Sequence, residues 1–174
     1  MATKIVQKED PVLRKKAAEI PVSEIKSAKI KNIIKDMKTA LKKESDGVAI
    51  AAPQIGESVR IFVISEKVYG NFFGETGVEE NEGLVYINPK ITKKSKREKL
   101  MFEGCLSVRP LWGHVKRATQ VTVEAYNENG EKFTRGAGGI LAHIFQHEIE
   151  HLDGVLFIDK SKDVKTLEEH GLAE

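Results

Sequence analysis

The chain has 174 residues, of which 40% are hydrophobic and 31% charged, and its formal net charge is +2. This composition is typical of one globular domain with its own core, so we expect a single domain over residues 1–174 with a short polar tail from about residue 161. The small net charge gives no indication of a nucleic-acid or membrane partner. A single cysteine, Cys105, excludes an intrachain disulfide and fits a reducing compartment.

The first eleven residues contain no apolar run of signal-peptide length, and their acidic residues Glu9 and Asp10 are unlike an organellar transit peptide. No apolar run in the sequence approaches the length of a membrane span. We therefore expect a cytoplasmic protein without a membrane partner.

The segment from Ser23 to Glu44 predicts an N-terminal amphipathic helix, with Ser23 as N-cap and Ser45–Gly47 as the stop. Lysines fill the face opposite its apolar residues and are expected to be solvated. Small apolar residues follow from Gly47 to Gly56, where Gln54 is the only side chain with hydrogen-bonding groups. Such an amide can be a donor aimed at a ligand, although a buried turn whose glutamine bonds the backbone is the simpler interpretation.

Two strands are predicted next. Val59–Ile64 is rich in β-branched residues and is expected to be covered on both faces. Glu66–Gly83 is polar and glycine-rich and is interpreted as a long surface loop. Leu84–Ile91 resumes a strand pattern, and its Asn88–Pro89 pair indicates an edge position or the end of the strand.

A basic segment with Glu98 as its only acidic residue follows this strand. It predicts either an anion-facing or RNA-facing surface, or an exposed sheet edge that its charge protects from aggregation. We favour the second interpretation, which needs no ligand. The basic residues are Lys90, Lys93, Lys94, Lys96, Arg97 and Lys99.

Thr119–Tyr126 alternates apolar and polar residues, and Asn129–Gly130 predicts a hairpin turn before a partner strand at Glu131–Arg135. A glycine-rich stretch then leads into a second helix, which Gly154 can end. Strands around two segregated helices predict an α+β fold, with antiparallel or mixed sheets packed around the C-terminal helix.

The pattern H-E-x-x-H lies on this second helix as His147, Glu148 and His151. Two histidines one helical turn apart can bind one metal ion, with Glu148 placed to act on a metal-bound water. His143 shares their face but lies on the far side from His151, so we interpret it as pocket wall or a core histidine.

These patterns do not decide which residue is the third ligand of the metal ion. Phe157 stands where the metzincin pattern requires a histidine, which excludes that class. Glu168 or Glu169 would give the His₂Glu site of a zinc endopeptidase, and Cys105 would give His₂Cys. Three protein ligands leave a tetrahedral metal one position for water, which is the catalytic pattern.

Three blocks in this order make the chain resemble the peptide deformylase family: a small-residue run ending in Gln54, E-G-C-L-S from Glu103, and Q-H-E-x-x-H-L from Gln146. The similarity extends to residues 10–14, 87–89 and 156–159, and excludes the loop at 66–83 and the last dozen residues. The resemblance implies a catalytic domain that removes the formyl group from N-formylmethionine of nascent polypeptides and releases formate.

The resemblance also implies a role for individual residues. Cys105, His147 and His151 would hold one divalent metal ion, which is Fe(II) by kinship, while zinc, nickel or cobalt can occupy purified proteins. Glu148 would be the general acid/base. The side chain of Gln54 and the backbone N–H of Leu106 would hold the developing oxyanion, and the implied substrate-binding residues are Val48, Ala49, Met101, Gly104, Ile140, His143 and Ile144.

The chain departs from the family pattern at four positions. Ala49 replaces a glycine and places a methyl group where substrate backbone is expected to pass. Glu150 replaces an aspartate between the histidines, and His143 replaces an aliphatic or arginine side chain. Trp112 stands where some relatives carry a substrate-contacting arginine, so no role is transferred to it.

A nascent-chain substrate implies a transient ribosome contact and no specific nucleic-acid partner. Some relatives dock through a long basic C-terminal helix, whereas residues 161–174 are few and mixed in charge. Two alternatives stay open: the zinc endopeptidase, and an inactive relative that binds the ribosome or RNA through its lysine-rich segment.

Overall fold

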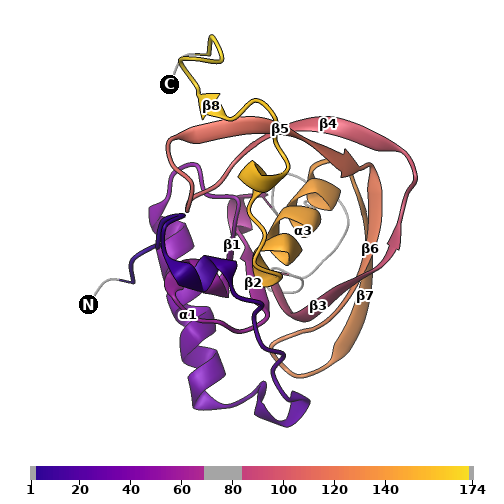
Figure 1. The fold of residues 1–174 in the computed structure, drawn as a ribbon. Coiled ribbons are helices and arrows are strands. Elements are labelled where there is room, and N and C mark those ends of the chain that lie inside the picture. Colours follow the sequence, from indigo (N-terminus) through magenta and orange to yellow (C-terminus); the bar gives the residue numbers. More distant parts are fainter. Residues whose placement is uncertain (1–2, 69–83, 173–174) are drawn as a thin grey trace.

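The structure is a computed structural model that describes residues 3–68 and 84–172, so the loop expected at 66–83 lies almost wholly outside the described residues. Helix α3 lies inside a frame of strands and α1 lies outside it (Figure 1). The helices are α1 (Ala28–Lys43) and α3 (Gly139–Leu152), with short 3-10 helices η1 (Pro11–Arg14), η2 (Val22–Glu24), η3 (Ala52–Ile55) and η4 (Phe157–Asp159).

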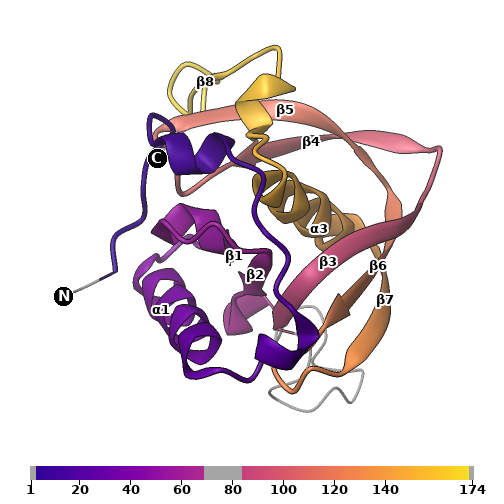
Figure 2. The ribbon, with the colours of Figure 1, turned by 60° about the horizontal axis from the view of Figure 1, so that its bottom comes forward.

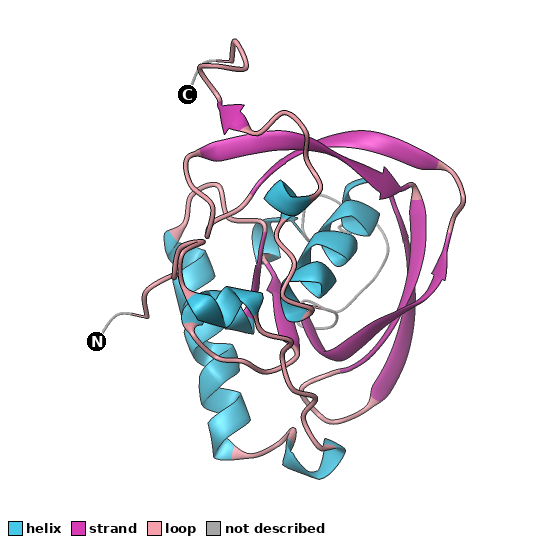
Figure 3. Ribbon diagram, in the orientation of Figure 1, coloured by secondary structure: helices cyan, strands magenta, loops and turns pink. Residues whose placement is uncertain are grey.

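The strands form two antiparallel sheets, drawn in magenta in Figure 3. The five-stranded sheet has the order β1 (Ala49–Ala51), β2 (Ile61–Ile64), β3 (Val85–Lys94), β6 (Gln120–Tyr126) and β7 (Lys132–Gly138). The three-stranded sheet has the order β4 (Glu98–Gly104), β5 (Leu111–Ala118) and β8 (Lys165–Thr166). The predicted α+β class is therefore confirmed.

Strand β2 separates the two main parts of the core, because its alternate side chains face opposite layers. Phe62 belongs to the cluster around α3, where its ring stacks on Tyr86 at a centroid distance of 4.5 Å. Ile61 and Val63 belong to the cluster beneath α1. All four residues of β2 are buried, so the predicted strand with two covered faces is confirmed, and Figure 2 shows α1 and α3 on its two sides.

Helix α1 starts later than the sequence predicts. Ser23 lies in η2, and the helix begins at Ala28 with Ser27 as its N-cap. The Ser27 hydroxyl accepts a hydrogen bond from the Ile30 N–H at 3.3 Å, which satisfies one of the free donors of the first turn. Ser23, the predicted N-cap, therefore belongs to the separate turn η2.

The strand end predicted at Asn88–Pro89 is wrong, because β3 continues to Lys94 beside β6, whereas the predicted edge agrees with the end of its pairing with β2 at Ile87. Asn88 has a φ of 50°, and the register with β6 shifts between Ile87 and Lys90, as in a β-bulge. The Asn88 amide exchanges two hydrogen bonds with the backbone of Ile20, at 2.9 and 2.7 Å. Pro89, which has no N–H to donate, follows this bulge on the part of β3 that is not paired with β2.

The basic segment follows this bulge. Among the described residues, β2 pairs with β3 only as far as Ile87, so the second half of β3 is an edge on that side. The six basic residues of the segment are all exposed. The structure thus agrees with the predicted charged sheet edge.

The predicted hairpin and the predicted helix end are both confirmed. Strands β6 and β7 pair across a turn in which Gly130 has a φ of 77°. Gly154 follows α3 with a φ of 78°, and a Cβ there would lie 2.7 Å from the Arg14 carbonyl oxygen. A glycine is therefore required for both the backbone angle and the close approach.

Within residues 3–68 and 84–172, no helix has the length and apolar character needed to cross a bilayer.

Candidate metal centre and substrate cavity

The predicted ligands meet at one point. The ligand atoms of Cys105, His147 and His151 all lie within 4.8 Å of one another. Cys105 follows the end of β4, and its Sγ lies 3.2 Å from Nε2 of His151 on α3. One thiol and two imidazoles at this spacing form a donor set that suits a divalent transition metal.

Helix α3 is fixed against the strands by hydrogen bonds between side chains and backbone groups of neighbouring elements. Gln146 accepts from the Ala118 N–H at 2.9 Å and donates to the Ala118 carbonyl at 3.0 Å, which joins α3 to β5. At the C-terminal end of α3, the Arg60 guanidinium donates to the Leu152 carbonyl at 3.1 Å. Because the middle and the C-terminal end of α3 are held, the two histidines have fixed positions relative to the strands.

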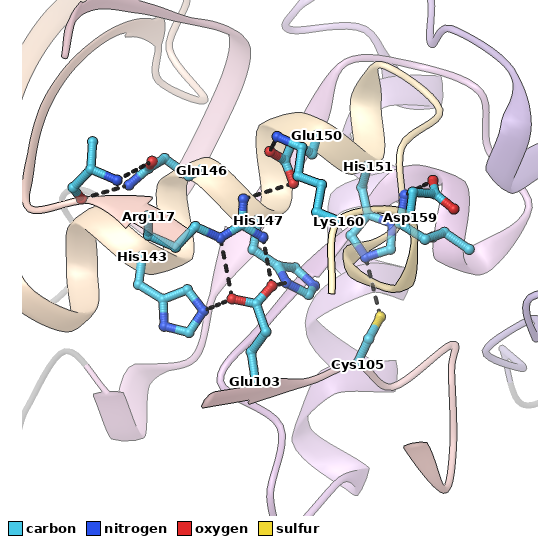
Figure 4. A network of polar contacts seen from close by, with 12 residues as sticks. Glu103, Cys105, Arg117, His143, Gln146, His147, Glu150, His151, Asp159 and Lys160 are labelled. Atoms are coloured by element: carbon cyan, nitrogen blue, oxygen red, sulfur yellow. Dashed lines mark hydrogen bonds and ion pairs between the residues drawn. The ribbon is translucent and has the colours of Figure 1, made fainter. Parts of the chain in front are cut away.

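Glu103 is the centre of a buried hydrogen-bond network (Figure 4). Its carboxylate accepts from Arg117 at 2.5 and 3.2 Å, from Nδ1 of His147 at 3.0 Å, and from Nε2 of His143. Burial raises the pKa of Glu103, but the bonds from the two histidines and Arg117 outweigh it and hold the pKa well below its usual range. The carboxylate is therefore ionised and turns Nε2 of His147 towards Cys105.

A second group of potential ligands, Glu103, His143 and His147, also lies within 4.8 Å. Both oxygens of Glu103 already accept hydrogen bonds from Arg117 and a histidine, so this carboxylate is less available to a metal. His143 is therefore a hydrogen-bonded wall residue, in agreement with its interpretation from the sequence.

The tail glutamates required by the endopeptidase alternative lie elsewhere. Glu169 is exposed and accepts from the Thr166 N–H at 2.8 Å, and Glu168 is exposed as well. Among the described residues, neither glutamate belongs to a group of potential metal ligands, and neither lines the cavity that is described below. Phe157, at the position of the missing metzincin histidine, stacks beside His147 with ring centroids 6.2 Å apart.

Glu148 is 4% exposed, and its Oε2 has no hydrogen-bond partner among the described residues. Burial raises the pKa of Glu148 to about 7, against the opposing effect of the neighbouring His147. Burial also lowers the pKa of His151, with His147 adding to that effect, and this favours the neutral ring that a metal ligand requires. In His147, burial lowers the pKa, but hydrogen bonds with Cys105 and Glu103 raise it above the usual value.

Gln54 is held so that its amide nitrogen faces the ligands. Its Oε1 accepts from the Ala51 N–H at 2.9 Å, and its Nε2 lies 3.1 Å from the Ser107 hydroxyl and 3.6 Å from Cys105 Sγ. The backbone bond to Ala51 thus fixes which end of the amide points inward.

The N-terminal segment fastens Gln54 and Leu106 through their carbonyls. Val6 N–H donates to the Gln54 carbonyl at 2.9 Å, and Gln7 Nε2 donates to the Leu106 carbonyl at 3.1 Å. Two segments that are distant in sequence are therefore joined beside the candidate metal centre.

A cavity of about 480 Å³ opens beside these residues. Val48 and Ile140, which are 45% and 39% exposed, lie at its mouth. Met101 does not line the cavity, whereas Phe102, Glu103 and Gly104 do, so the cavity reaches only the last three residues of β4. The predicted substrate-binding residues that do line it are Val48, Ala49, Gly104, Ile140, His143 and Ile144.

The sequence analysis missed several residues of this site. Glu103 stood in the E-G-C-L-S block, and its position two residues before the candidate ligand Cys105 was the available signal. Trp112 and Leu167 also line the cavity. The signal for Trp112 was its position, where some relatives carry a substrate-contacting arginine, whereas no motif marked Leu167. Glu150, which replaces an aspartate of the family pattern, lies 2.8 Å from the Arg117 guanidinium and so extends the buried network.

Comparison with known proteins gives one family. The family model described as polypeptide deformylase matches residues 2–167. The chain is 43% identical to peptide deformylase 2 of Clostridium acetobutylicum over 151 residues, which is 87% of this chain and 89% of the relative. It is 39% identical to the chloroplastic/mitochondrial peptide deformylase 1A of Arabidopsis thaliana over 162 residues, which is 90% of this chain but 60% of that relative.

A solved structure gives the same family. The crystal structure of peptide deformylase from Thermotoga maritima is similar with a TM-score of 0.78 and 31% identity. The match covers 94% of this chain and 99% of that chain.

Proposed function

The chain belongs to the polypeptide deformylase family, and from this premise we propose how its residues remove the formyl group from N-formylmethionine peptides. The family is one of hydrolases that use a divalent metal. The observation that carries the assignment of residues is the meeting of three ligand atoms within 4.8 Å, two of which belong to Cys105 and His147 on the wall of a cavity that Glu148 and Gln54 also line.

Cys105, His147 and His151 would hold the metal ion. They fit it because a thiol and two imidazoles converge, and because Glu103 leaves Nε2 of His147 free to face the centre. A divalent ion bound there supplies Lewis acidity, which makes water a nucleophile near neutral pH. We propose Fe(II) from the family resemblance, since thiolate and imidazole ligands also accept zinc, nickel and cobalt.

The protein residues then carry the proton and the charge. Glu148 takes a proton as the water oxygen attacks the formyl carbon, and gives it to the nitrogen as the C–N bond breaks. The Gln54 amide and the Leu106 N–H donate to the oxyanion that develops on the formyl oxygen. Formate and a free N-terminal amine leave, while the methionine side chain lies against Ile140 and Ile144.

Replacing Cys105 by serine tests the ligand assignment. We expect the Cys105→Ser variant to lose most of its bound iron and its formate release from a formyl-Met peptide, assayed anaerobically after iron loading, because a hydroxyl is a poorer ligand than a thiolate. The matched control is Glu168→Gln, which changes an exposed residue that the endopeptidase alternative needs. A Cys105→Ser protein that keeps its iron and its activity would contradict the assignment.

We also propose a transient ribosome contact and a cytoplasmic location, because the substrate is the end of a chain under synthesis. The exposed basic residues between Lys90 and Lys99 support this proposal, since cations of this kind bind RNA phosphates. Sedimentation with ribosomes should decrease with added salt and with Lys93→Glu and Lys96→Glu together. Activity on a free peptide should stay unchanged in that variant, and unaltered sedimentation would exclude this segment as the contact.

A further inference from the structure

The cavity has a second apolar surface, formed by Phe102, Trp112 and Leu167, which we name the outer wall. The rings of Phe102 and Trp112 stack with centroids 5.5 Å apart and an interplanar angle of 19°. The Trp112 ring also lies over Gly104, where a Cβ would be 2.8 Å from the ring. Because Gly104 precedes Cys105, the outer wall begins directly beside the candidate metal centre.

The C-terminal segment 163–170 holds the outer wall in place. Strand β8 pairs Thr166 with Leu111 and Lys165 with Trp112, which brings Leu167 to the cavity. His170 donates a ring N–H to the Trp112 carbonyl at 3.0 Å, and its ring meets the Phe102 ring edge-on at a centroid distance of 5.1 Å.

A further bond fastens the start of this segment. The Asp163 carboxylate accepts from the His114 backbone N–H at 2.8 Å and from its ring at 2.6 Å. Backbone pairing, two histidines and one carboxylate therefore fix a segment whose contribution to the cavity is one leucine. Such an arrangement is expected where the exact position of a wall matters to a ligand.

The cavity is also larger than the methionine side chain requires. Its volume of about 480 Å³ falls in the range of sites that take a whole small ligand. Ile140 and Ile144, which are proposed above to contact the methionine side chain of the substrate, come from α3. The outer wall comes from β4, β5 and the segment after β8. Two apolar surfaces from different elements thus flank Cys105.

We propose that the outer wall binds the side chain of the residue that follows formylmethionine in the substrate, and that it favours large apolar or aromatic side chains there. This inference rests on the proposed function. Stacked aromatic rings and a leucine offer apolar area and ring faces, and they offer no charged group to a polar side chain. The wall acts on binding of the peptide and takes no part in proton transfer.

A substrate series tests the preference. Wild-type protein should show kcat/KM about tenfold higher for formyl-Met-Phe amide than for formyl-Met-Ser amide, mainly through KM. Leu167→Ala should remove most of this preference, and formyl-Met amide, which lacks the second residue, is measured beside the two as the reference substrate. Leu167→Met should keep the preference, and Glu168→Ala, an exposed neighbour in the same segment, should match wild type.

His170 serves as a positioning residue in the same series. His170→Ala should reduce the preference for phenylalanine, and His170→Gln should restore part of it, because the glutamine amide can donate to the Trp112 carbonyl. Trp112 is the only tryptophan of the chain, so its fluorescence reports binding without turnover. Titration with Met-Phe amide should change that emission in wild type and more weakly in Leu167→Ala.

The outcomes separate this inference from the proposed function. Failure to release formate from every substrate contradicts the proposed function itself. Normal release with a phenylalanine preference that survives Leu167→Ala overturns the outer-wall inference alone. An equal loss of kcat on all three substrates would show that Leu167 acts only through the fold, and would overturn it as well.

Discussion

Glu148→Ala is expected to lower kcat for formate release on the order of 10²–10⁴-fold, with little change in KM. Glu148 is the only proton carrier assigned to the reaction, and burial raises its pKa to about 7, where it can both take and give a proton near neutral pH. The measurement is anaerobic formate release from a formyl-Met peptide by iron-loaded protein.

Glu148→Gln is the matched variant, because glutamine keeps the size and polarity of the side chain but cannot carry the proton. It should lose as much activity as Glu148→Ala, while both variants bind iron as wild type does. Substantial activity in Glu148→Gln would exclude proton transfer by this residue. Loss of iron from either variant would instead point to a role in holding the metal.

Glu103→Ala is expected to have the largest effect on stability, with a loss of about 3–5 kcal/mol in the free energy of unfolding. Arg117 is only 3% exposed, and the substitution leaves its charge buried without its main partner. The same change removes the acceptor for Nδ1 of His147, so iron affinity should fall about 10–100-fold. Urea unfolding and competition with a chelator measure the two effects separately.

A double variant separates the two roles of Glu103. Glu103→Leu with Arg117→Met removes both charges, and replacing a buried ion pair by apolar residues is often neutral or stabilising. Stability should therefore recover in the double variant, whereas iron affinity should stay low because His147 still lacks its acceptor. Recovery of iron affinity together with stability would contradict the orienting role.

Local sequence patterns predicted the parts of the site that depend on a single element. The spacing of His147 and His151 needs only a helix, and the ends of α3 followed from Gly154 and the glycines before it. The role of Glu103 depends instead on how β4 packs on α3, which no local pattern contains. The same limit explains Met101, because how far the cavity extends along β4 depends on the elements packed around it.

The C-terminal segment shows a similar limit. Its sequence predicted a polar tail, because residues 161–174 contain two lysines, one aspartate and three glutamates. A two-residue strand has no recognisable period, so β8 could be found only from its pairing with β5. Leu167 reaches the cavity through that pairing.

The bonds that Val6 and Gln7 make to Gln54 and Leu106 have a consequence for the order of folding. The Gln7 bond joins residues 99 positions apart in the chain. Contacts of such separation form late, because the entropy of closing the loop is lost before the contact is gained. The proposed oxyanion donors, on Gln54 and Leu106, are therefore expected to reach their final positions only after the N-terminal segment has closed over this separation of 99 residues.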